Sequence, residues 1–294
     1  MSIFSGIWIP LVTPFRGGVV DHRALAGLVE RYRDAGVAGF AALGTTGEPS
    51  ALSGEEQDAV LATVLRAAEG LPVIAGITGN RAVALRERLS QLNDQAIDGV
   101  LVSAPYYIRP SQAGLVEHFT SLADASAKPI VLYDIPYRTG VRIELDTLMT
   151  LAAHPRIQAI KDCSGVPETT LALILDGRLK VLTGNDDAMF STLCMGGAGA
   201  IAATAHVRTE RFVAMYRALV RGDLNEGRAI YRELAPLMRA LVSEPNPAPV
   251  KAALAAQGWL ENELRSPMTP ASDALTRELS TLAALSCGAI DNSR

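Results

Sequence analysis

The sequence predicts an α/β protein, a (β/α)8 barrel with a C-terminal helical extension, on three observations. Short apolar runs alternate with amphipathic helical stretches, which is typical of βα units around a parallel sheet. The runs are apolar at nearly every position, as expected for strands that are covered on both faces. Eight such units fit within residues 1–222, and an open doubly wound sheet rarely needs eight regular repeats.

The eight predicted strands are separated by segments long enough for a helix. In chain order they are Gly6–Val12, Gly39–Leu43, Pro72–Ile77, Gly99–Ser103, Pro129–Asp134, Ile157–Lys161, Leu179–Thr183 and Ala200–Ala203. Glycine favours the end of a helix, because it adopts the left-handed conformation there without strain. Three glycines stand where helices should stop: Gly36, Gly70 and Gly177.

Two helix starts and one turn are also predicted between the strands. Ser53 and Glu56 have the spacing of a capping box, in which each side chain bonds the backbone N–H of the other residue. Asp186 is expected to cap a second helix that runs to Met195. The pair at 17–18, Gly-Gly, predicts a turn near the exit of the first strand.

After residue 208 the strand pattern ends and the chain becomes helical. The expected helices are Arg211–Arg221, Leu224–Leu241 and Val250–Gln257. Prolines at 245, 247 and 249 exclude a continuous helix between the last two and predict a rigid connector. We therefore predict a barrel over residues 1–222 and a helical bundle over residues 223–294, with residues 290–294 frayed.

Composition and charge limit the classes of partner. The chain has 294 residues, 49% of them hydrophobic, and a net charge of -4, so no general attraction to nucleic acid or anionic lipid is expected. No apolar run approaches the roughly 18 residues that span a bilayer. The N-terminus also lacks the basic and apolar regions of a secretory signal. These features predict a soluble cytoplasmic protein whose partners are small molecules or copies of itself.

Neither a disulfide framework nor a metal site is expected. The three cysteines, Cys163, Cys194 and Cys287, have no CxxC spacing, which suits a reducing compartment. The four histidines lie far apart and form no HxH or HxxxH pair. Residues distant in sequence can still meet in a fold, so spacing alone leaves a metal site open.

Lys161 is the candidate nucleophile of the sequence. Of the four lysines, Lys128 and Lys180 lie at strand starts and Lys251 falls in the helical tail. Lys161 alone ends a buried strand, and active sites of α/β barrels lie at that side. Burial would lower its pKa from about 10.4 and leave an amine that can attack a ketone. The protonated imine that results would make the neighbouring carbon acidic.

Polar side chains follow the other predicted strands, and in a barrel all of these strand ends meet at one mouth. They are Thr45 and Thr46, Tyr106 and Tyr107, and Tyr133 and Arg138. Hydroxyl groups could move protons, and the arginine could hold a carboxylate by two hydrogen bonds. A reaction through an imine needs these groups rather than a metal.

Each feature also has a purely structural interpretation. Lys161 could pair with the carboxylate of Asp162 or Asp134, and Arg138 could be a surface side chain. Two tyrosines after a strand are commonly one packed and one exposed. The glycine-rich segment 196–199 lacks the Lys-Ser/Thr of a phosphate loop, so we interpret it as the turn into the eighth strand. The coincidence of the polar groups at strand ends favours a functional role.

The motifs together resemble the dihydrodipicolinate synthase family, within the class I pyruvate-dependent aldolases and lyases. They are GTTGE at 44–48, PYYIRP at 105–110, YDIP at 133–136, RTG at 138–140, Lys161 and EPNP at 244–247. The resemblance covers nearly the whole chain. It implies condensation of pyruvate with L-aspartate 4-semialdehyde to 4-hydroxy-tetrahydrodipicolinate, for lysine and diaminopimelate biosynthesis. It implies no cofactor beyond a covalent imine.

The resemblance also gives roles to individual residues. Those for catalysis are Lys161, Tyr133, Thr45 and Tyr107, and those for substrate binding are Thr46, Arg138, Gly184 and Ile201. Lys161 would form the Schiff base with pyruvate, and Tyr133 would exchange protons with it. Tyr107 would reach the site of a neighbouring subunit, which implies a homotetramer built as a dimer of dimers. Arg138 would receive the carboxylate of the aldehyde.

Several positions depart from the commonest family pattern. Pro49 follows the GTTGE motif, Asp134 replaces a frequent asparagine, and Asp162 and Cys163 follow the lysine. Asp at 134 and 162 also occurs in sister activities. The alternatives are therefore a sister aldolase for sialic acid, a 2-keto-3-deoxy sugar acid, hydroxy-oxoglutarate or an aromatic aldehyde adduct, and a non-catalytic pyruvate-binding homologue. The paired threonines and Arg138 favour the synthase.

The resemblance also bears on feedback by L-lysine. Sensitive members use a histidine and a glutamate where this chain has Gln57 and Ala84. We predict weak or absent inhibition, and a sub-millimolar inhibition constant would contradict this.

Overall fold

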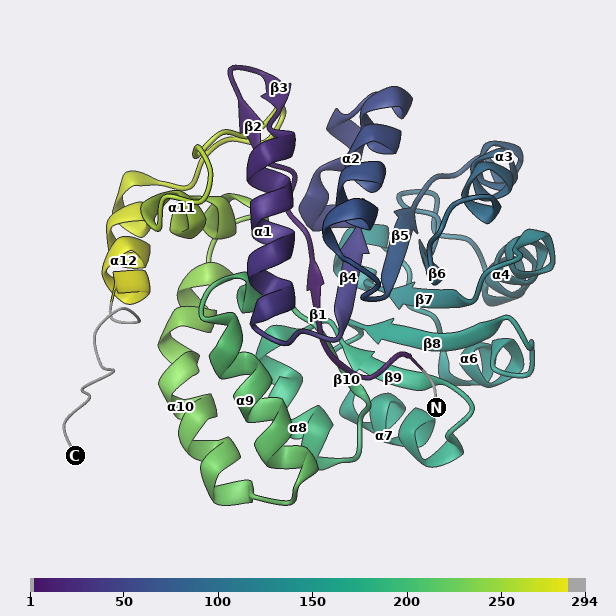
Figure 1. Ribbon diagram of the computed structural model, residues 1–294. Coiled ribbons are helices and arrows are strands. Elements are labelled where there is room, and N and C mark those ends of the chain that lie inside the picture. The colour runs from purple at the N-terminus through teal and green to yellow at the C-terminus, as the bar shows by residue number, and fades with distance from the viewer. Residues whose placement is uncertain (1–2, 285–294) are drawn as a thin grey trace.

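The computed structural model describes residues 3–284, and its central feature is a closed parallel barrel of eight strands (Figure 1). The strands are β1 (Gly6–Pro10), β4 (Gly39–Ala42), β5 (Val73–Ile77), β6 (Gly99–Ser103), β7 (Ile130–Asp134), β8 (Ile157–Asp162), β9 (Lys180–Thr183) and β10 (Gly199–Ile201). They follow one another around the ring in chain order, and β10 closes it against β1. The predicted barrel and all eight predicted strands are confirmed.

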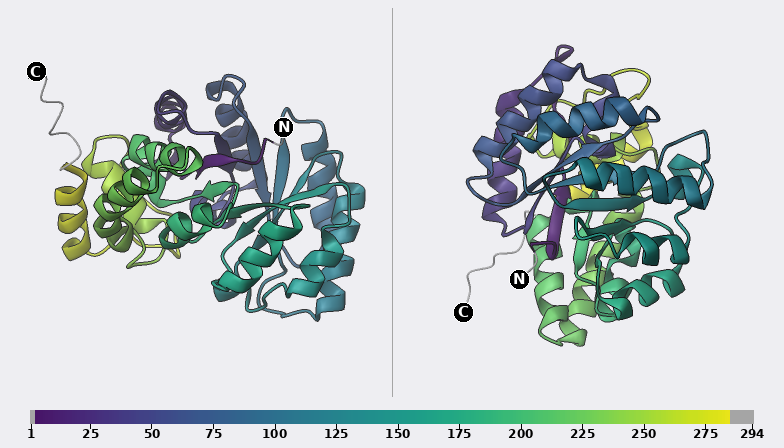
Figure 2. Two further views of the ribbon diagram at one scale, coloured as in Figure 1. Left: turned by 90° about the horizontal axis from the view of Figure 1, so that it is seen from below. Right: turned by 90° about the vertical axis from the view of Figure 1, so that its right-hand side faces the viewer.

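Helices cover the outside of the barrel, as the alternating pattern predicts (Figures 1 and 2). They are α1 (His22–Asp34), α2 (Gly54–Ala67), α3 (Ala82–Asn93), α4 (Gln112–Ala125), α6 (Leu145–Leu151), α7 (Pro167–Asp176), α8 (Met189–Cys194) and α9 (Thr209–Val220). Short helical turns follow the strands: η1 (Thr45–Gly47), η2 (Pro49–Ala51), α5 (Pro136–Thr139), η3 (Asp186–Ala188) and η4 (Thr204–His206). A hairpin of β2 (Phe15–Arg16) and β3 (Val19–Val20) confirms the turn at 17–18.

The strands separate two layers of apolar side chains. Val131 and Tyr133 of β7 pack inside the barrel, whereas Leu132 packs with the larger cluster under the helices. Successive side chains of a strand point to opposite faces. In β8, Ala159 therefore packs inside and Ile160 outside. This alternation places Lys161, two residues after Ala159, on the inner face.

The predicted helix signals have different outcomes. The capping box of Ser53 and Glu56 is present, and Gly177 ends α7 in the left-handed conformation with a φ of 75°. The predicted cap by Asp186 is wrong. The chain first forms η3, α8 starts only at Met189, and the Asp186 carboxylate instead accepts a hydrogen bond from the backbone N–H of Thr204 at 2.9 Å.

The helices after the barrel are α10 (Leu224–Leu241), α11 (Ala248–Ala256) and α12 (Asp273–Ala284), and they gather on one side of it (Figure 2). The connector differs slightly from the prediction, because Pro249 lies inside the first turn of α11. Proline is tolerated there because the backbone N–H groups of the first helical turn have no carbonyl partner within the helix, so no hydrogen bond is lost. α10 packs along α9. The boundary between the barrel and the helical bundle, after residue 222, stays a prediction.

Residues 290–294 and Cys287, for which expectations were given, lie outside the described residues. Within residues 3–284, no helix combines the length and the apolar character that crossing a bilayer requires.

Candidate active site

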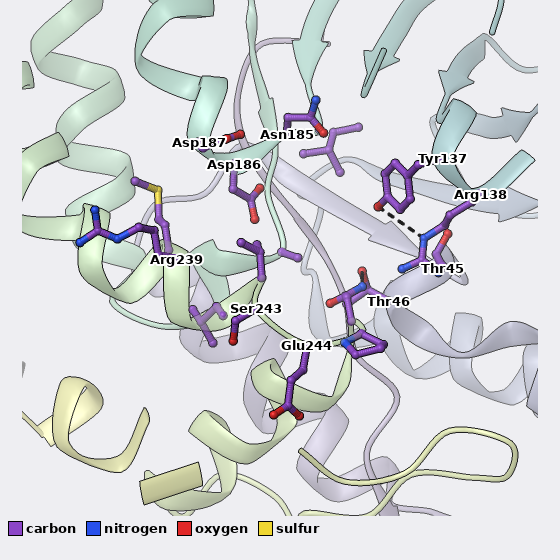
Figure 3. Close-up of a pocket in the computed structure, with 18 of the residues that line it drawn as sticks. Thr45, Thr46, Tyr137, Arg138, Asn185, Asp186, Asp187, Arg239, Ser243 and Glu244 are labelled. Atoms are coloured by element: carbon purple, nitrogen blue, oxygen red, sulfur yellow. Dashed lines mark hydrogen bonds between the residues drawn. The ribbon is translucent and has the colours of Figure 1, made fainter. Parts of the chain in front are cut away.

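A cavity of about 780 Å³ opens at the carboxyl ends of the barrel strands (Figure 3). Of the eight residues predicted for the site, seven line it: Thr45, Thr46, Tyr133, Arg138, Lys161, Gly184 and Ile201. They come from five different strand ends and were brought together only by the fold. Tyr107 is the predicted residue that does not line this cavity.

Lys161 lines the cavity from the inner face of β8. It is 6% exposed and pairs in register with Tyr133 of the neighbouring strand. Its Nζ lies 4.5 Å from the centre of the Tyr133 ring. Gly184 makes room for it, because a Cβ at this position would lie 2.5 Å from Lys161 Cε. The lysine is therefore confined between an aromatic ring and bare backbone.

The surroundings of Lys161 favour a neutral amine. Burial lowers the pKa of Lys161, and the nearby Cys163 and Asp186 oppose this shift only in part. Within residues 3–284, no carboxylate lies within 4.0 Å of its Nζ. A buried lysine without a close counter-ion loses its proton more readily, which is the condition for a nucleophilic amine.

The alternative in which Lys161 pairs with Asp162 or Asp134 is contradicted. Both carboxylates lie on the opposite face of their strands, toward the helices. Asp162 accepts hydrogen bonds from the Thr170 hydroxyl at 2.5 Å and the Ser164 backbone N–H at 2.8 Å. Asp134 accepts one from the backbone N–H of Ile143 at 3.1 Å, and its other carboxylate oxygen has no partner.

The Asp134 carboxyl leads to a stability prediction. Burial raises its pKa from 3.8 to about 7. Between these values the folded chain keeps a proton that the unfolded chain has lost, so the free energy of unfolding falls as pH rises through this window. Asp134→Asn cannot ionise. We expect it to be more stable than the wild type by roughly 4 kcal/mol at pH 8, with little difference near pH 4.

Denaturant unfolding of both proteins at the two pH values measures this effect. Asp94→Asn, at an exposed carboxylate, is the control and should give no such pH-dependent difference. A stability gap between Asp134→Asn and the wild type that is the same at pH 4 and pH 8 would contradict the assignment.

Tyr133 and Thr45 form a pair of hydroxyl groups beside Lys161. Burial raises the pKa of Tyr133 well above its usual value, Cys163 adds to this, and a hydrogen bond with the Thr45 hydroxyl opposes it. The phenol therefore stays protonated near neutral pH and can donate a proton to a bound substrate.

The turn η1 places Thr45 and Thr46 on the wall of the cavity. Its backbone is packed tightly, since a Cβ on Gly47 would lie 3.0 Å from the carbonyl oxygen of Leu11. The Thr46 hydroxyl accepts a hydrogen bond from Asn246 Nδ2 at 2.9 Å. The start of a helical turn leaves backbone N–H groups free to bind an anion.

Arg138 supplies positive charge at the outer part of the cavity. It lies on α5, and Figure 3 places its guanidinium near Thr45. Its Nε donates to the hydroxyl of Tyr137 at 3.4 Å. Arg138 is an exposed side chain, as its structural interpretation holds, and it also lines the cavity that contains Lys161.

Tyr107 lies outside the cavity and points into solvent. It is 88% exposed, and its backbone has a φ of 73°, which a non-glycine residue rarely adopts. Its backbone N–H donates to the carbonyl of Thr139 at 3.0 Å. Tyr106, Ile108 and Tyr137 are exposed near it in the same two loops. In a single chain, therefore, Tyr107 has no contact with the other predicted catalytic residues.

The cavity contains residues that sequence reasoning missed. Asp186 lines it, and its unpaired Oδ1 is buried, while burial raises its pKa to about 6. Asp186 follows a strand end, so the rule applied to the other strands could have identified it. The outer wall comes from α10 and the connector, including Arg239, Ser243, Glu244 and Asn246. These residues do not follow a strand, so the strand-end rule could not have identified them.

A second cavity of about 440 Å³ includes the positions expected to bear on L-lysine feedback. Gln57, Asn80, Ala84, Arg88 and Tyr106 line it, and none of its lining residues is acidic. No carboxylate there can hold a side-chain ammonium. Weak inhibition by L-lysine therefore stays a prediction, now with a physical reason.

The family relationship of the chain follows from comparison with known proteins. The model of the Dihydrodipicolinate synthetase family matches residues 3–285. The chain belongs to this family. The 4-hydroxy-tetrahydrodipicolinate synthase of Hyphomonas neptunium is 42% identical over 272 residues, which cover 91% of this chain and 93% of that protein. The resemblance drawn from the motifs is thus confirmed.

Solved structures of the dihydrodipicolinate synthetase family share the whole fold. That of dihydrodipicolinate synthase from Thermotoga maritima has a TM-score of 0.94 and 33% identity, and covers 97% of this chain and 99% of its own. A monomeric dihydrodipicolinate synthase variant has a TM-score of 0.93 and 33% identity over 97% of both chains. This fold therefore occurs in a monomeric relative.

Proposed function

We propose that the chain is a 4-hydroxy-tetrahydrodipicolinate synthase, a lyase that condenses pyruvate with L-aspartate 4-semialdehyde. The observation that supports this best is Lys161, a buried amine with a lowered pKa that shares a cavity with Tyr133 and Arg138. Family membership supports the same reaction, since relatives carry this enzyme name.

The reaction begins when the neutral Lys161 amine adds to the keto carbon of pyruvate. Loss of water gives a protonated imine, which makes the methyl protons acidic, and removal of one of them gives an enamine. The enamine carbon attacks the aldehyde carbon of the second substrate, and the new oxyanion takes a proton. The amino group of that substrate then attacks the imine carbon, closes the ring and releases Lys161.

We assign the proton transfers to Tyr133 and the Thr45 hydroxyl beside it, with Tyr107 as the third member of the relay. Tyr133 lies beside the imine, because the centre of its ring is 4.5 Å from Lys161 Nζ. No metal or other cofactor takes part in this scheme.

Substrate binding is assigned to groups around the same cavity. Thr46 and the backbone N–H groups of η1 hold the pyruvate carboxylate, and Arg138 holds the carboxylate of the aldehyde by two hydrogen bonds. Gly184 and Ile201 shape the inner wall through their backbones. Pyruvate thus lies deep in the cavity, and the second substrate lies nearer the opening.

A homotetramer built as a dimer of dimers is part of this proposal. The exposed Tyr107, in its left-handed backbone, would enter the site of the neighbouring subunit. Sedimentation measures the assembly. If the protein were a fully active monomer, Tyr107 could not be a member of the relay. We also propose a cytoplasmic location and a place on the diaminopimelate and lysine route.

The substrate assay tests the reaction. Pyruvate and L-aspartate 4-semialdehyde should disappear in equal amounts, whereas sugar-acid and aromatic substrates of sister aldolases should not react. Cleavage of a 2-keto-3-deoxy sugar acid without consumption of the semialdehyde would favour the sister aldolase instead.

A further inference from the structure

Lys251 is a second buried lysine, whose surroundings the sequence did not predict. Its side chain on α11 is 0% exposed. Its Nζ lies 2.5 Å from Glu48 Oε1, donates to the carbonyl of Glu263 at 2.9 Å and lies 4.2 Å from the centre of the Phe15 ring. Burying an ammonium is costly unless it is paired, so this position requires an explanation.

Glu48 connects this lysine to the turn that holds Thr45 and Thr46. Its backbone N–H donates to the carbonyl of Thr45 at 3.2 Å and closes η1, with a left-handed φ of 52°. A non-glycine residue keeps this conformation only where surrounding contacts maintain it. The buried Glu48 side chain makes them: one oxygen pairs with Lys251, and the other accepts from the backbone N–H of Arg265 at 3.3 Å.

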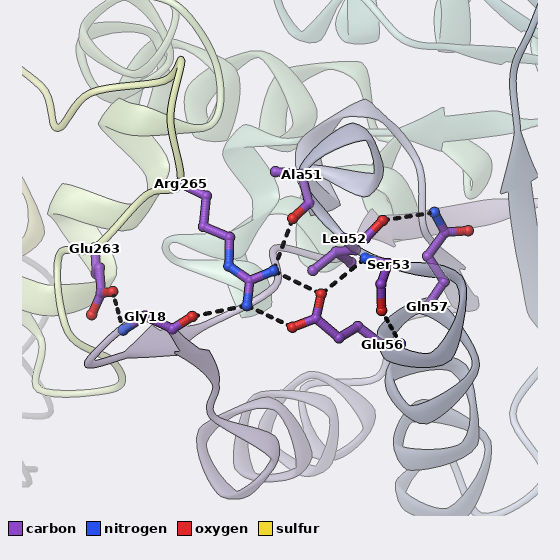
Figure 4. A network of polar contacts seen from close by, with 8 residues as sticks. All are labelled: Gly18, Ala51, Leu52, Ser53, Glu56, Gln57, Glu263 and Arg265. Atoms are coloured by element: carbon purple, nitrogen blue, oxygen red, sulfur yellow. Dashed lines mark hydrogen bonds and ion pairs between the residues drawn. The ribbon is translucent and has the colours of Figure 1, made fainter.

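The same part of the tail makes further contacts with this loop. Asn246 donates to the Thr46 hydroxyl at 2.9 Å. Arg265 donates to the carbonyl of Ala51 at 2.8 Å and to the two carboxylate oxygens of Glu56 at 2.6 and 2.8 Å (Figure 4). Residues 246–265 therefore hold the loop 45–56 from outside the barrel.

We propose that Lys251 is a positioning residue for pyruvate binding. Its buried ion pair with Glu48 holds the turn at Thr45 and Thr46 in the geometry that receives the pyruvate carboxylate. Lys251 does not line the cavity of Lys161, so it acts through Glu48 rather than on the substrate. This inference rests on the proposed function, in which the turn binds that carboxylate.

The test removes both charges and keeps the shapes of the side chains. The double variant Glu48→Gln/Lys251→Met leaves no buried charge unpaired, and its methionine still packs on the Phe15 ring, so the fold persists. We expect the KM for pyruvate to rise at least about tenfold, together with the pyruvate concentration for half-maximal borohydride labelling of Lys161. The kcat and the KM for the semialdehyde should change less than about threefold.

Two further variants make the result decisive. Arg221→Met/Glu226→Gln removes an exposed ion pair between the end of α9 and the start of α10 and should leave the KM for pyruvate unchanged. If the double variant does not fold, Glu48→Asp replaces it, because this change keeps both charges and shortens the side chain that holds the turn, with an expected rise of at least about threefold. A folded variant with the wild-type KM for pyruvate, or with a loss in kcat alone, overturns the proposal. Absence of labelling in the wild type would instead refute the proposed function.

Discussion

Replacing Lys161 with alanine is expected to lower kcat at least about a thousandfold while the barrel stays folded. The loss follows because no other group in the cavity can form the imine. Folding should persist, since the substitution removes a buried amine that has no carboxylate within 4.0 Å among the described residues, so no partner charge is left unpaired. Turnover of pyruvate and the semialdehyde, together with thermal unfolding, measures both parts.

Lys180→Ala is the matched control for this variant. Lys180 begins β9 and is exposed, so its loss should leave turnover within about twofold of the wild type. A folded Lys161→Ala protein with more than about a tenth of wild-type turnover would contradict the Schiff-base mechanism.

Tyr133→Phe is expected to lower kcat by about a hundredfold to ten-thousandfold, the range typical of losing a general acid or base. The substitution removes the phenolic hydroxyl and keeps the ring that packs near Lys161 Nζ. The imine with pyruvate should therefore still form, and the later proton transfers should become slow. Steady-state kinetics and borohydride labelling with pyruvate alone separate these two steps.

Tyr216→Phe provides the control, because Tyr216 lies on α9 and lines a different cavity, at the opposite end of the barrel strands. It should keep wild-type kcat. If Tyr133→Phe also kept wild-type kcat, the assignment of the proton transfers to Tyr133 would be wrong.

The barrel and the site residues that follow its strands could be predicted because each depends on short stretches of sequence. An apolar run predicts a buried strand, and a polar residue directly after it lies at the mouth of a barrel. Thr45, Tyr133, Arg138 and Lys161 all follow this rule, and the fold brings them to one cavity.

The contacts between the tail and the loop after β4 could not be predicted in this way. Asn246 and Lys251 lie in the tail and reach the loop after β4 across about 200 residues of chain, and no local pattern encodes such a contact. Asp186 was interpreted as a helix cap, since an aspartate before a helix usually bonds its backbone. In the structure, that carboxylate accepts a hydrogen bond from the backbone N–H of Thr204 instead.

The position of Tyr107 shows a different limit. Its exposure and its strained backbone are properties of a single chain, and its proposed role needs a second one. Neither the sequence pattern nor the fold of one chain determines what it contacts. The family resemblance alone assigned it to the relay.

The central claim is that Lys161 forms an imine with pyruvate, and borohydride reduction tests it directly. The protein is incubated with pyruvate, reduced, digested and mapped by mass spectrometry. The account predicts one reduced pyruvate adduct, on the peptide that contains Lys161, and none without pyruvate. An unmodified Lys161, or an adduct on Lys128, Lys180 or Lys251 in its place, would contradict the account.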